Sequence, residues 1–420
     1  MNLLAVSLAF PPLAYPRSIQ VARLLAHTDA SVALFCAHER NARLDQTIEP
    51  LAESRLASCI RIPVPNGKVD GYIDSLTHRF ARGIWGRRNL MPDKYRPWRK
   101  AVIQAVLRYV ETTELKPDAI VTFAQPFSSH LIGLELRSRL RLPWLAHFSD
   151  PWVDNPFSPF DTSSRNANLE LEGSVTENAD VLAFTSSETI ELYFGKYPGH
   201  LRKKARLLPQ SFDPDLFRGG KSSRPEKITI RYVGNFYGDR TPRPLISALK
   251  ELDQRSPEIL RGVSFELIGA GDAEQVARLA PGLAPGLITT RTSVPYSESL
   301  DLMMTADGLM VIDAPARLSV FLPSKLIDYI GAGRPILGIT PPGAADKLIR
   351  EMGGFVADPS DSGEIVNMLE LFILELRKRR GTPKPFPDAN TRIRDRYAIK
   401  QVASDFDSIL RKMITNSRLI

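Results

Sequence analysis

Cysteine is scarce in this sequence, and the usual signatures of zinc-binding and membrane-spanning proteins are missing. Cys36 and Cys59 are the two cysteines among 420 residues, so a disulfide framework is excluded, and no Cys-x-x-Cys pair is present for zinc. No zinc-finger, RRM or KH pattern occurs, which argues against a nucleic-acid partner. No stretch of about 18 apolar residues predicts a transmembrane helix. We therefore expect a cytoplasmic protein in a reducing compartment.

The first ten residues, MNLLAVSLAF, are apolar but lack the basic start of a signal peptide, and Pro11-Pro12 cuts the run short. A first β-strand that leads into a loop fits them better. The composition, with 43% hydrophobic and 24% charged residues, is that of a globular protein. The net charge of +8 favours anionic partners such as nucleotide diphosphates or lipid head groups.

Short apolar runs alternate with amphipathic stretches along the chain, which predicts an α/β protein with parallel sheets. The length favours two domains. We expect an N-terminal domain over 1–207, a linker over 208–227, a second domain over 228–395, and a helix over 396–420 that packs back on the first domain. The predicted fold is two Rossmann-like domains that face each other across a cleft. The strands are expected at 2–10, 31–37, 118–123, 143–148, 228–234, 263–271, 306–313 and 334–340.

The loop after the strand at 228–234 is the first candidate site. Gly234 ends the strand, and Asn235 and Arg240 follow in a polar loop before an amphipathic stretch. A glycine at this place lets a ligand approach the backbone, and Arg240 would donate charge-assisted hydrogen bonds to a diphosphate. The alternative is an ordinary strand–helix turn with an arginine on the surface.

The segment FLPSKLIDYIGAG (321–333) is the second candidate site. Ser324 and Lys325 fall in the first turn of a predicted helix, and Asp328 shares a face with Lys325. A carboxylate there can accept hydrogen bonds from a ribose diol. The alternative is a capped helix with a solvated Lys–Asp pair. Gly269, in ELIGAGD, marks either a tight turn or a contact to a nucleotide base.

The first domain offers candidates for the acceptor side. Asp150 stands at the end of the predicted strand 143–148 and could orient an acceptor hydroxyl, or could simply form a turn before Pro151. His147 is a catalytic candidate whose alternative is a place in the strand core. Trp152 could stack on a sugar or pack its loop. Arg17 could meet a phosphate or could be solvated at the start of a helix.

A basic and aromatic segment lies at 79–100, where eight Lys or Arg residues accompany one acid, Asp93. Basic and aromatic residues together suit an anionic membrane surface, each cation contributing about 1 kcal/mol near it. The segment therefore predicts a peripheral contact with the inner face of the cell membrane. A solvated loop is the alternative.

The order of FPP with Arg17, YVGNFYGDR, ELIGAGD and PSKLIDYIGAGRPIL resembles the family-4 glycosyltransferases of the GT-B fold, over nearly the whole chain. The segments MPDKYRPWRKAV, KPDAIVTFAQPFSSHLIG and LPWLAHFSDPWVDNPF are similar to the acceptor-side domain of bacterial members that build cell-surface polysaccharides.

The resemblance implies roles for individual residues. Gly234 and Arg240 would meet the donor phosphates with Lys325, and Asp328 would hold the ribose where the family usually has Glu. The family pattern of two Glu separated by seven residues has Val320 at its first position here. The carboxylate that faces the donor sugar is therefore missing from its usual place.

The function expected from these observations is glycosyl transfer from a nucleotide sugar to a glycan, lipid-linked or small-molecule acceptor. Arg240, Lys325 and a helix N-terminus would stabilise the departing diphosphate without a metal or other cofactor. The resemblance implies retention at the anomeric carbon. Two alternatives stay open: a sugar-nucleotide epimerase of the same fold, and a non-catalytic relative that binds a nucleotide sugar.

Overall fold

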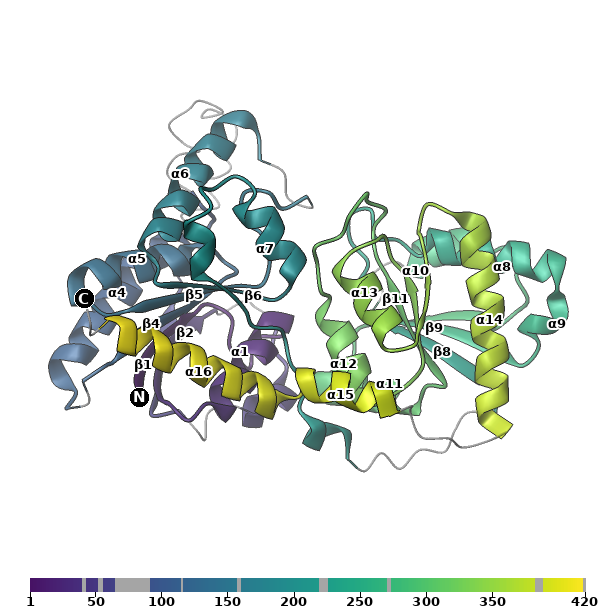
Figure 1. Ribbon diagram of the computed structural model, residues 1–420. Coiled ribbons are helices and arrows are strands. Elements are labelled where there is room, and N and C mark those ends of the chain that lie inside the picture. The colour runs from purple at the N-terminus through teal and green to yellow at the C-terminus, as the bar shows by residue number, and fades with distance from the viewer. Residues whose placement is uncertain are drawn as a thin grey trace. The chain divides into compact units, whose positions relative to one another are not determined.

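The structure is a computed structural model that describes residues 1–39, 43–51, 56–64, 91–114, 116–156, 160–218, 226–269, 273–381 and 388–417. These residues form two compact units (Figure 1). Unit 1 contains Met1–Pro209 and Val402–Ile420, and unit 2 contains Gln210–Gln401. Both units are α/β with a parallel sheet, so the predicted fold class is confirmed, while the cleft between the two domains stays a prediction.

Unit 1 is built on a seven-stranded sheet of order β3-β2-β1-β4-β5-β6-β7. The order runs outward in both directions from β1 and β4, as in Rossmann-like sheets. Its elements are β1 (Asn2–Ser7), α1 (Pro16–His27), β2 (Ser31–His38), η1 (Gln46–Leu51), β3 (Ser58–Pro63), α4 (Arg96–Thr112), β4 (Ala119–Phe123), α5 (Ser128–Leu140), β5 (Trp144–Phe148), α6 (Thr162–Asn178), β6 (Val181–Phe184), α7 (Ser187–Phe194), η3 (Leu201–Lys204) and β7 (Ala205–Leu207).

Alternate residues of the strands in unit 1 enter two separate cores. Leu4 and Val6 pack with α4 and α5, whereas Leu3 and Ala5 pack with α1 and with α16 (Ile399–Ser417). This alternation is the period of an extended chain buried on both faces. Helix α16 contributes five buried apolar residues to the second core and lies along the sheet in Figure 1: Val402, Phe406, Leu410, Met413 and Ile414.

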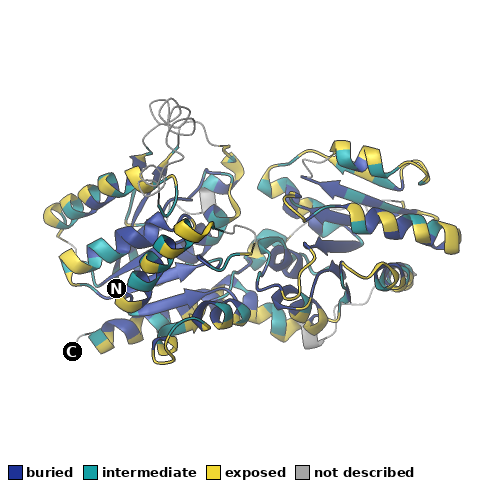
Figure 2. Cartoon of the chain, turned by 90° about the horizontal axis from the view of Figure 1, so that it is seen from above, coloured by how far each residue is buried: buried dark blue, intermediate teal, exposed yellow. Residues whose placement is uncertain are grey.

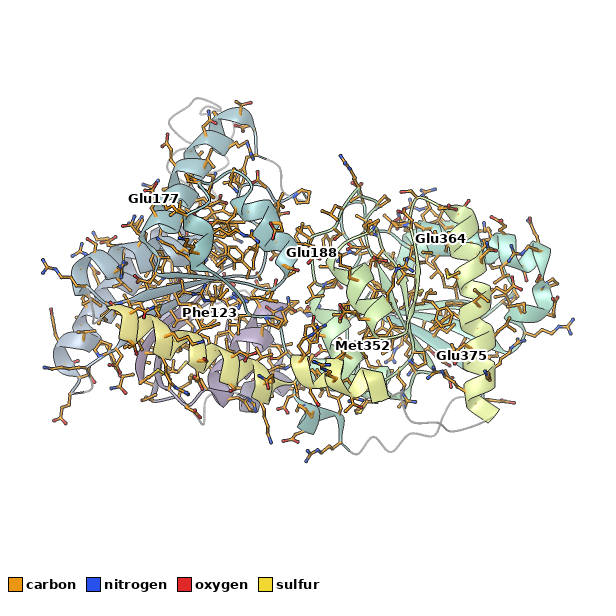
Figure 3. All side chains as sticks on the ribbon, viewed as in Figure 1. Phe123, Glu177, Glu188, Met352, Glu364 and Glu375 are labelled. Atoms are coloured by element: carbon orange, nitrogen blue, oxygen red, sulfur yellow. The ribbon has the colours of Figure 1, made fainter. Side chains whose placement is uncertain are left out.

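Unit 2 carries a six-stranded sheet of order β10-β9-β8-β11-β12-β13, whose central strands β8, β11 and β12 are buried (Figure 2). Its elements are η4 (Pro214–Phe217), β8 (Ile228–Val233), α8 (Arg243–Arg255), α9 (Pro257–Leu260), β9 (Val263–Ile268), α10 (Ala273–Leu279), β10 (Ile288–Arg291), α11 (Tyr296–Thr305), β11 (Gly308–Ile312), α12 (Ser324–Ala332), β12 (Ile336–Ile339), α13 (Ala344–Glu351), β13 (Phe355–Ala357), α14 (Ser362–Gly381) and α15 (Asp388–Tyr397). Glu364 and Glu375, labelled in Figure 3, lie on α14, and Met352 follows α13.

No helix among the described residues is long and apolar enough to span a membrane.

Candidate functional site

The candidate donor site lies at the carboxyl ends of β8 and β11, which are neighbours in the sheet of unit 2. The chain runs from β8 to β9 on one side and returns to β11 on the other, so a topological switch point falls between these two strands. Open parallel sheets bind ligands at such points. Gly234 follows β8, Asp313 follows β11, and Lys325 lies in the first turn of α12.

Gly234 and Lys325 are in close contact. Gly234 has a φ of +143°, and a Cβ atom at this position would lie 2.5 Å from Lys325 Nζ. A side chain here would therefore occupy the space of the ammonium group, and the backbone conformation favours glycine. The structure thus gives Gly234 a specific role, which is to leave room for Lys325, rather than that of an ordinary turn residue.

The ammonium group of Lys325 is buried, and among the described residues it has no hydrogen-bond partner. It lies 3.7 Å from the centre of the Tyr232 ring, which in turn stacks on Phe236 at 4.4 Å. Burial lowers the pKa of Lys325 well below its usual value, the positive charge of Arg240 lowers it further, and Asp313 opposes both. The alternative of a solvated Lys–Asp pair is therefore wrong, since the ammonium group of Lys325 is withdrawn from water.

Arg240 is paired with a carboxylate that the sequence did not single out. Its Nε donates to Asp313 Oδ1 at 3.1 Å, its Nη2 donates to the same oxygen at 2.5 Å, and its Nη1 donates to the hydroxyl of Tyr237 at 2.7 Å. Burial acts to lower the pKa of Arg240, but the charge and hydrogen bonds of Asp313, together with the neighbouring Tyr237 and Tyr232, outweigh burial and raise it. The alternative of a surface arginine is wrong, because Arg240 is only 6% exposed.

Asp313 accepts two further hydrogen bonds, both from residues of the loop that follows β11. The backbone N–H of Ala314 donates to Oδ1 at 3.0 Å, and the hydroxyl of Ser319 donates to Oδ2 at 3.3 Å. The signal in the sequence was a single acid directly after the apolar run GLMVI. Such a residue falls at the carboxyl end of a strand, where sites in these folds are built.

The remaining predicted donor residues lie around this centre. Asn235 is exposed, and a Cβ atom at Gly269 would lie 3.4 Å from Asn235 Oδ1, so the loops after β8 and β9 meet. Ser324 opens α12 without a capping side-chain hydrogen bond. Asp328, one turn later, is buried and accepts a hydrogen bond from the Tyr296 hydroxyl at 3.1 Å.

Val320 stands where a family-4 sequence would carry its first Glu, and its side chain is only 5% exposed. Neighbouring Ser319 is held by two backbone hydrogen bonds, one to the carbonyl of Pro342 at 2.8 Å and one from the N–H of Ala344 at 3.0 Å. A Cβ atom at Gly343 would lie 1.9 Å from the Ser319 carbonyl oxygen. This part of the loop is therefore fixed with an apolar residue facing inward.

The acceptor candidates in unit 1 include one direct pair, Arg17 with His147. Arg17 Nη2 lies 2.8 Å from His147 Nδ1 and donates to the His147 carbonyl at 3.2 Å. Since arginine only donates, Nδ1 accepts and the imidazole is neutral. Burial lowers the pKa of His147 well below its usual value, and Arg17 adds to this. Burial also lowers the pKa of Arg17 to about 9, against the attraction of Asp150.

Asp150 and Trp152 follow β5 in the same loop but have different surroundings. Asp150 is half-buried and accepts a hydrogen bond from the hydroxyl of Ser149 at 2.9 Å. Trp152 is 1% exposed, stacks on Phe127 at 4.6 Å, and donates its indole N–H to Asn168 at 2.9 Å. Placing Trp152 on the acceptor side is therefore wrong, because the ring is buried inside unit 1, where one face stacks on Phe127 and the indole N–H is bonded to Asn168.

The predicted membrane segment is only partly described, since 79–90 lie outside the described residues. In the described part, Trp98 is fully buried and donates its indole N–H to the carbonyl of Ile62 at 3.2 Å. Arg99 pairs with Glu135 at 2.8 Å. Trp98 is therefore part of the core of unit 1, and the charge of Arg99 is paired with Glu135. Neither residue is counted further in the predicted membrane surface.

Two Asp-x-Asp pairs occur in the sequence, and in the structure one aspartate of each pair accepts hydrogen bonds from protein groups. Asp213 accepts from the N–H of Asp215 at 3.0 Å at the start of η4. Asp407 accepts from the hydroxyl of Thr28 and from the N–H of Asp29. Within the described ranges, no group of three His, Cys, Asp or Glu side chains is placed to hold a metal ion.

Comparison with known proteins identifies the fold but not the family. No family model matches the sequence, and no curated protein matches it. Sucrose-phosphate synthase from Thermosynechococcus elongatus superposes with a TM-score of 0.68 at 16% identity, over 99% of this chain and 100% of that one. HepE from Anabaena, in complex with UDP and glucose, superposes with a TM-score of 0.64 at 16% identity, over 98% of this chain and 100% of that one.

The lipopolysaccharide outer core galactosyltransferase WaaB gives a TM-score of 0.59 at 12% identity, covering 98% of this chain and 99% of its own. These structures are GT-B proteins, so the GT-B fold predicted from the sequence is confirmed. Membership of family 4 stays a prediction.

Proposed function

We propose that the protein is a retaining glycosyltransferase that moves a sugar from a nucleotide sugar to a glycan, lipid-linked or small-molecule acceptor. The observation that carries the proposal is the buried ammonium of Lys325, which has no hydrogen-bond partner in the part of the chain that the structure describes. It lies beside Arg240 at the switch point of the sheet in unit 2. The fold adds support, since HepE, which shares it, was crystallised with UDP and glucose.

A buried amine without an acceptor destabilises a folded protein by about 1–3 kcal/mol. An anionic ligand would remove this cost, because it supplies the acceptor and favours the charged form of Lys325. A diphosphate fits the donors available: Lys325, the N–H groups of Arg240 that Asp313 and Tyr237 leave free, and the amides that open α12. Asp328, one turn along the same helix, is proposed to contact the ribose.

The chemistry follows from where charge develops. When the anomeric bond breaks, negative charge gathers on the nucleotide diphosphate, and Arg240 and Lys325 are proposed to stabilise it there without a metal ion. Retention, with the leaving phosphate helping to deprotonate the acceptor hydroxyl, is proposed from the family resemblance. In unit 1, Asp150 is proposed to orient that hydroxyl, and Arg17, held by His147, to bind a polar group of the acceptor.

The test is product analysis with the full chain and a panel of UDP-, GDP-, dTDP- and ADP-sugars, each alone and with sugar, sugar-phosphate and lipid-linked acceptors. A glycosylated acceptor and free nucleoside diphosphate support the proposal. An isomerised sugar from the donor alone identifies an epimerase instead. Binding without turnover identifies a non-catalytic relative, which the buried Val320 favours. No interaction with any donor contradicts the proposal altogether.

A role in polysaccharide biosynthesis and a peripheral position at the cytoplasmic membrane surface are part of the same proposal. They are supported by the basic, aromatic composition of 79–90. Flotation with vesicles of phosphatidylserine and phosphatidylcholine tests the membrane contact. Binding that disappears in pure phosphatidylcholine, or at high salt, is expected, and equal binding to both vesicles argues against it.

A further inference from the structure

Asp313 accepts four hydrogen bonds at the candidate donor site, and only 1% of its surface is exposed. Oδ1 accepts from Arg240 Nε and Nη2 and from the N–H of Ala314, and Oδ2 accepts from the hydroxyl of Ser319. The carboxylate therefore lies behind the guanidinium, in the protein interior. It is joined to the loop that follows β11, whereas Arg240 belongs to the loop that follows β8.

The hydrogen bonds fix the plane of the guanidinium. Arginine has five N–H donors, and protein acceptors are assigned to three of those of Arg240, through Nε, Nη1 and Nη2. Two N–H groups, one on each terminal nitrogen, remain for a ligand. A free arginine side chain would lose rotamer freedom when a ligand bound, and Arg240 has lost that freedom already.

We propose that Asp313 is a positioning residue: it orients Arg240 so that the two remaining N–H groups meet an oxygen of the donor diphosphate. This inference rests on the proposed function. Asp313 itself touches no ligand, because its four hydrogen bonds occupy both oxygens and its surface is buried. The opposite role is that of a competitor which holds Arg240 until phosphate displaces it. The two roles predict opposite changes in affinity when Asp313 is neutralised.

The test is a double-mutant cycle on nucleoside diphosphate binding, measured by calorimetry on the full chain with the nucleotide that binds the parent best. Asp313→Asn is expected to weaken binding by about tenfold to about a hundredfold, the range for one charge-assisted hydrogen bond. In an Arg240→Gln background the same change is expected to alter Kd less than about twofold, because a positioning residue acts only through its partner. Tighter binding by Asp313→Asn would establish the competitor role and overturn the proposal.

A pH profile separates positioning from a general loss of structure. The charged groups that act on Lys325 are Arg240, from the loop after β8, and Asp313, from the loop after β11, and Tyr232 of β8 contacts it with its ring. The negative charge of Asp313 favours protonated Lys325. Asp313→Asn should therefore move the alkaline loss of nucleotide affinity to lower pH. Asp313→Glu keeps the charge but displaces the guanidinium. It should therefore weaken nucleotide binding and leave the pH of the alkaline loss of affinity unchanged.

Each outcome is decisive. Equal loss of affinity from Asp313→Asn in the parent and in Arg240→Gln overturns the positioning role, even while nucleotide binding by the parent upholds the proposed function. Failure of the parent to bind any nucleotide overturns the proposed function itself. If Asp313→Asn unfolds, Asp313→Glu replaces it in the same cycle, with the same expected dependence on Arg240.

Discussion

Replacing Lys325 by methionine should stabilise the protein and abolish donor binding at the same time. Methionine keeps the length of the side chain and its packing on the Tyr232 ring, but it removes a buried amine for which the described residues offer no hydrogen-bond acceptor. Most substitutions in a buried site destabilise the fold. An increase in stability here would be the sign that Lys325 is retained for binding a ligand rather than for folding.

The size of the effect follows from the missing hydrogen bond. A buried unsatisfied donor costs about 1–3 kcal/mol, and the ring of Tyr232 offsets part of that cost. For a domain of 150–250 residues each kcal/mol shifts Tm by about 2–4 °C, so an increase of about 2–10 °C is expected.

The effect should also depend on pH. The pKa of folded Lys325 is lowered below its unfolded value, so the unfolded state binds the extra proton and stability rises with pH. The advantage of Lys325→Met is therefore largest below the folded pKa. As pH approaches the unfolded value of about 10.4, it falls to the part that comes from the missing hydrogen bond alone.

Thermal melts followed by circular dichroism at three pH values, with and without nucleotide, measure both quantities. Lys227→Met is a matched control, because Lys227 is an exposed lysine of the same unit, and it should change neither Tm nor nucleotide binding. A lower Tm for Lys325→Met would refute the reasoning about its unpaired amine. Undiminished stabilisation by nucleotide would refute its role in the site.

Three further changes test other parts of the site. Gly234→Ala places a methyl group 2.5 Å from Lys325 Nζ at a φ of +143°, so calorimetry should show at least about tenfold weaker nucleotide binding, with about 1–3 kcal/mol lost in denaturant unfolding. Val320→Glu buries a carboxyl group at a position that is 5% exposed, so the free energy of unfolding should fall by about 1–3 kcal/mol. Most of this loss should occur above pH about 5, where the unfolded side chain ionises, and no transfer activity should be gained. Arg17→Gln removes a charge that lowers the pKa of His147, so the His147 pKa observed by NMR should rise, and acceptor turnover should fall while nucleotide affinity stays unchanged.

The central strands were predictable because burial on both faces leaves a continuous apolar run. NLLAVS, AIVTF and GLMVI all became central strands in this way. The interior strand β6, VLAF, was not predicted although all four of its residues are buried. The edge strands were not predicted either, since a strand with only one neighbour need not be apolar throughout. β10, with the sequence ITTR, and β3, with SCIRIP, lie at sheet edges and are mostly half-buried or exposed.

At the candidate site, the sequence indicated the loops but not the partners. Gly234, Arg240 and Lys325 could be selected because each follows a strand or opens a helix. The pairing of Arg240 with Asp313 joins residues 73 positions apart, and it depends on β8 and β11 being neighbours in the sheet. Trp152 was misassigned because an aromatic residue in a loop carries no local signal of whether the loop folds over it.

Calorimetric titration of the full chain with the nucleotide-sugar panel, repeated on Arg240→Ala and Arg243→Ala, tests the central claim most directly. The account predicts that one donor binds the parent and that Arg240→Ala weakens this binding by about a hundredfold or more, from the loss of a cation and its hydrogen bonds to phosphate. Arg243, an exposed arginine at the start of α8, should be replaceable without effect. Equal affinity in the parent and in Arg240→Ala, or no binding of any donor to the parent, would contradict the account.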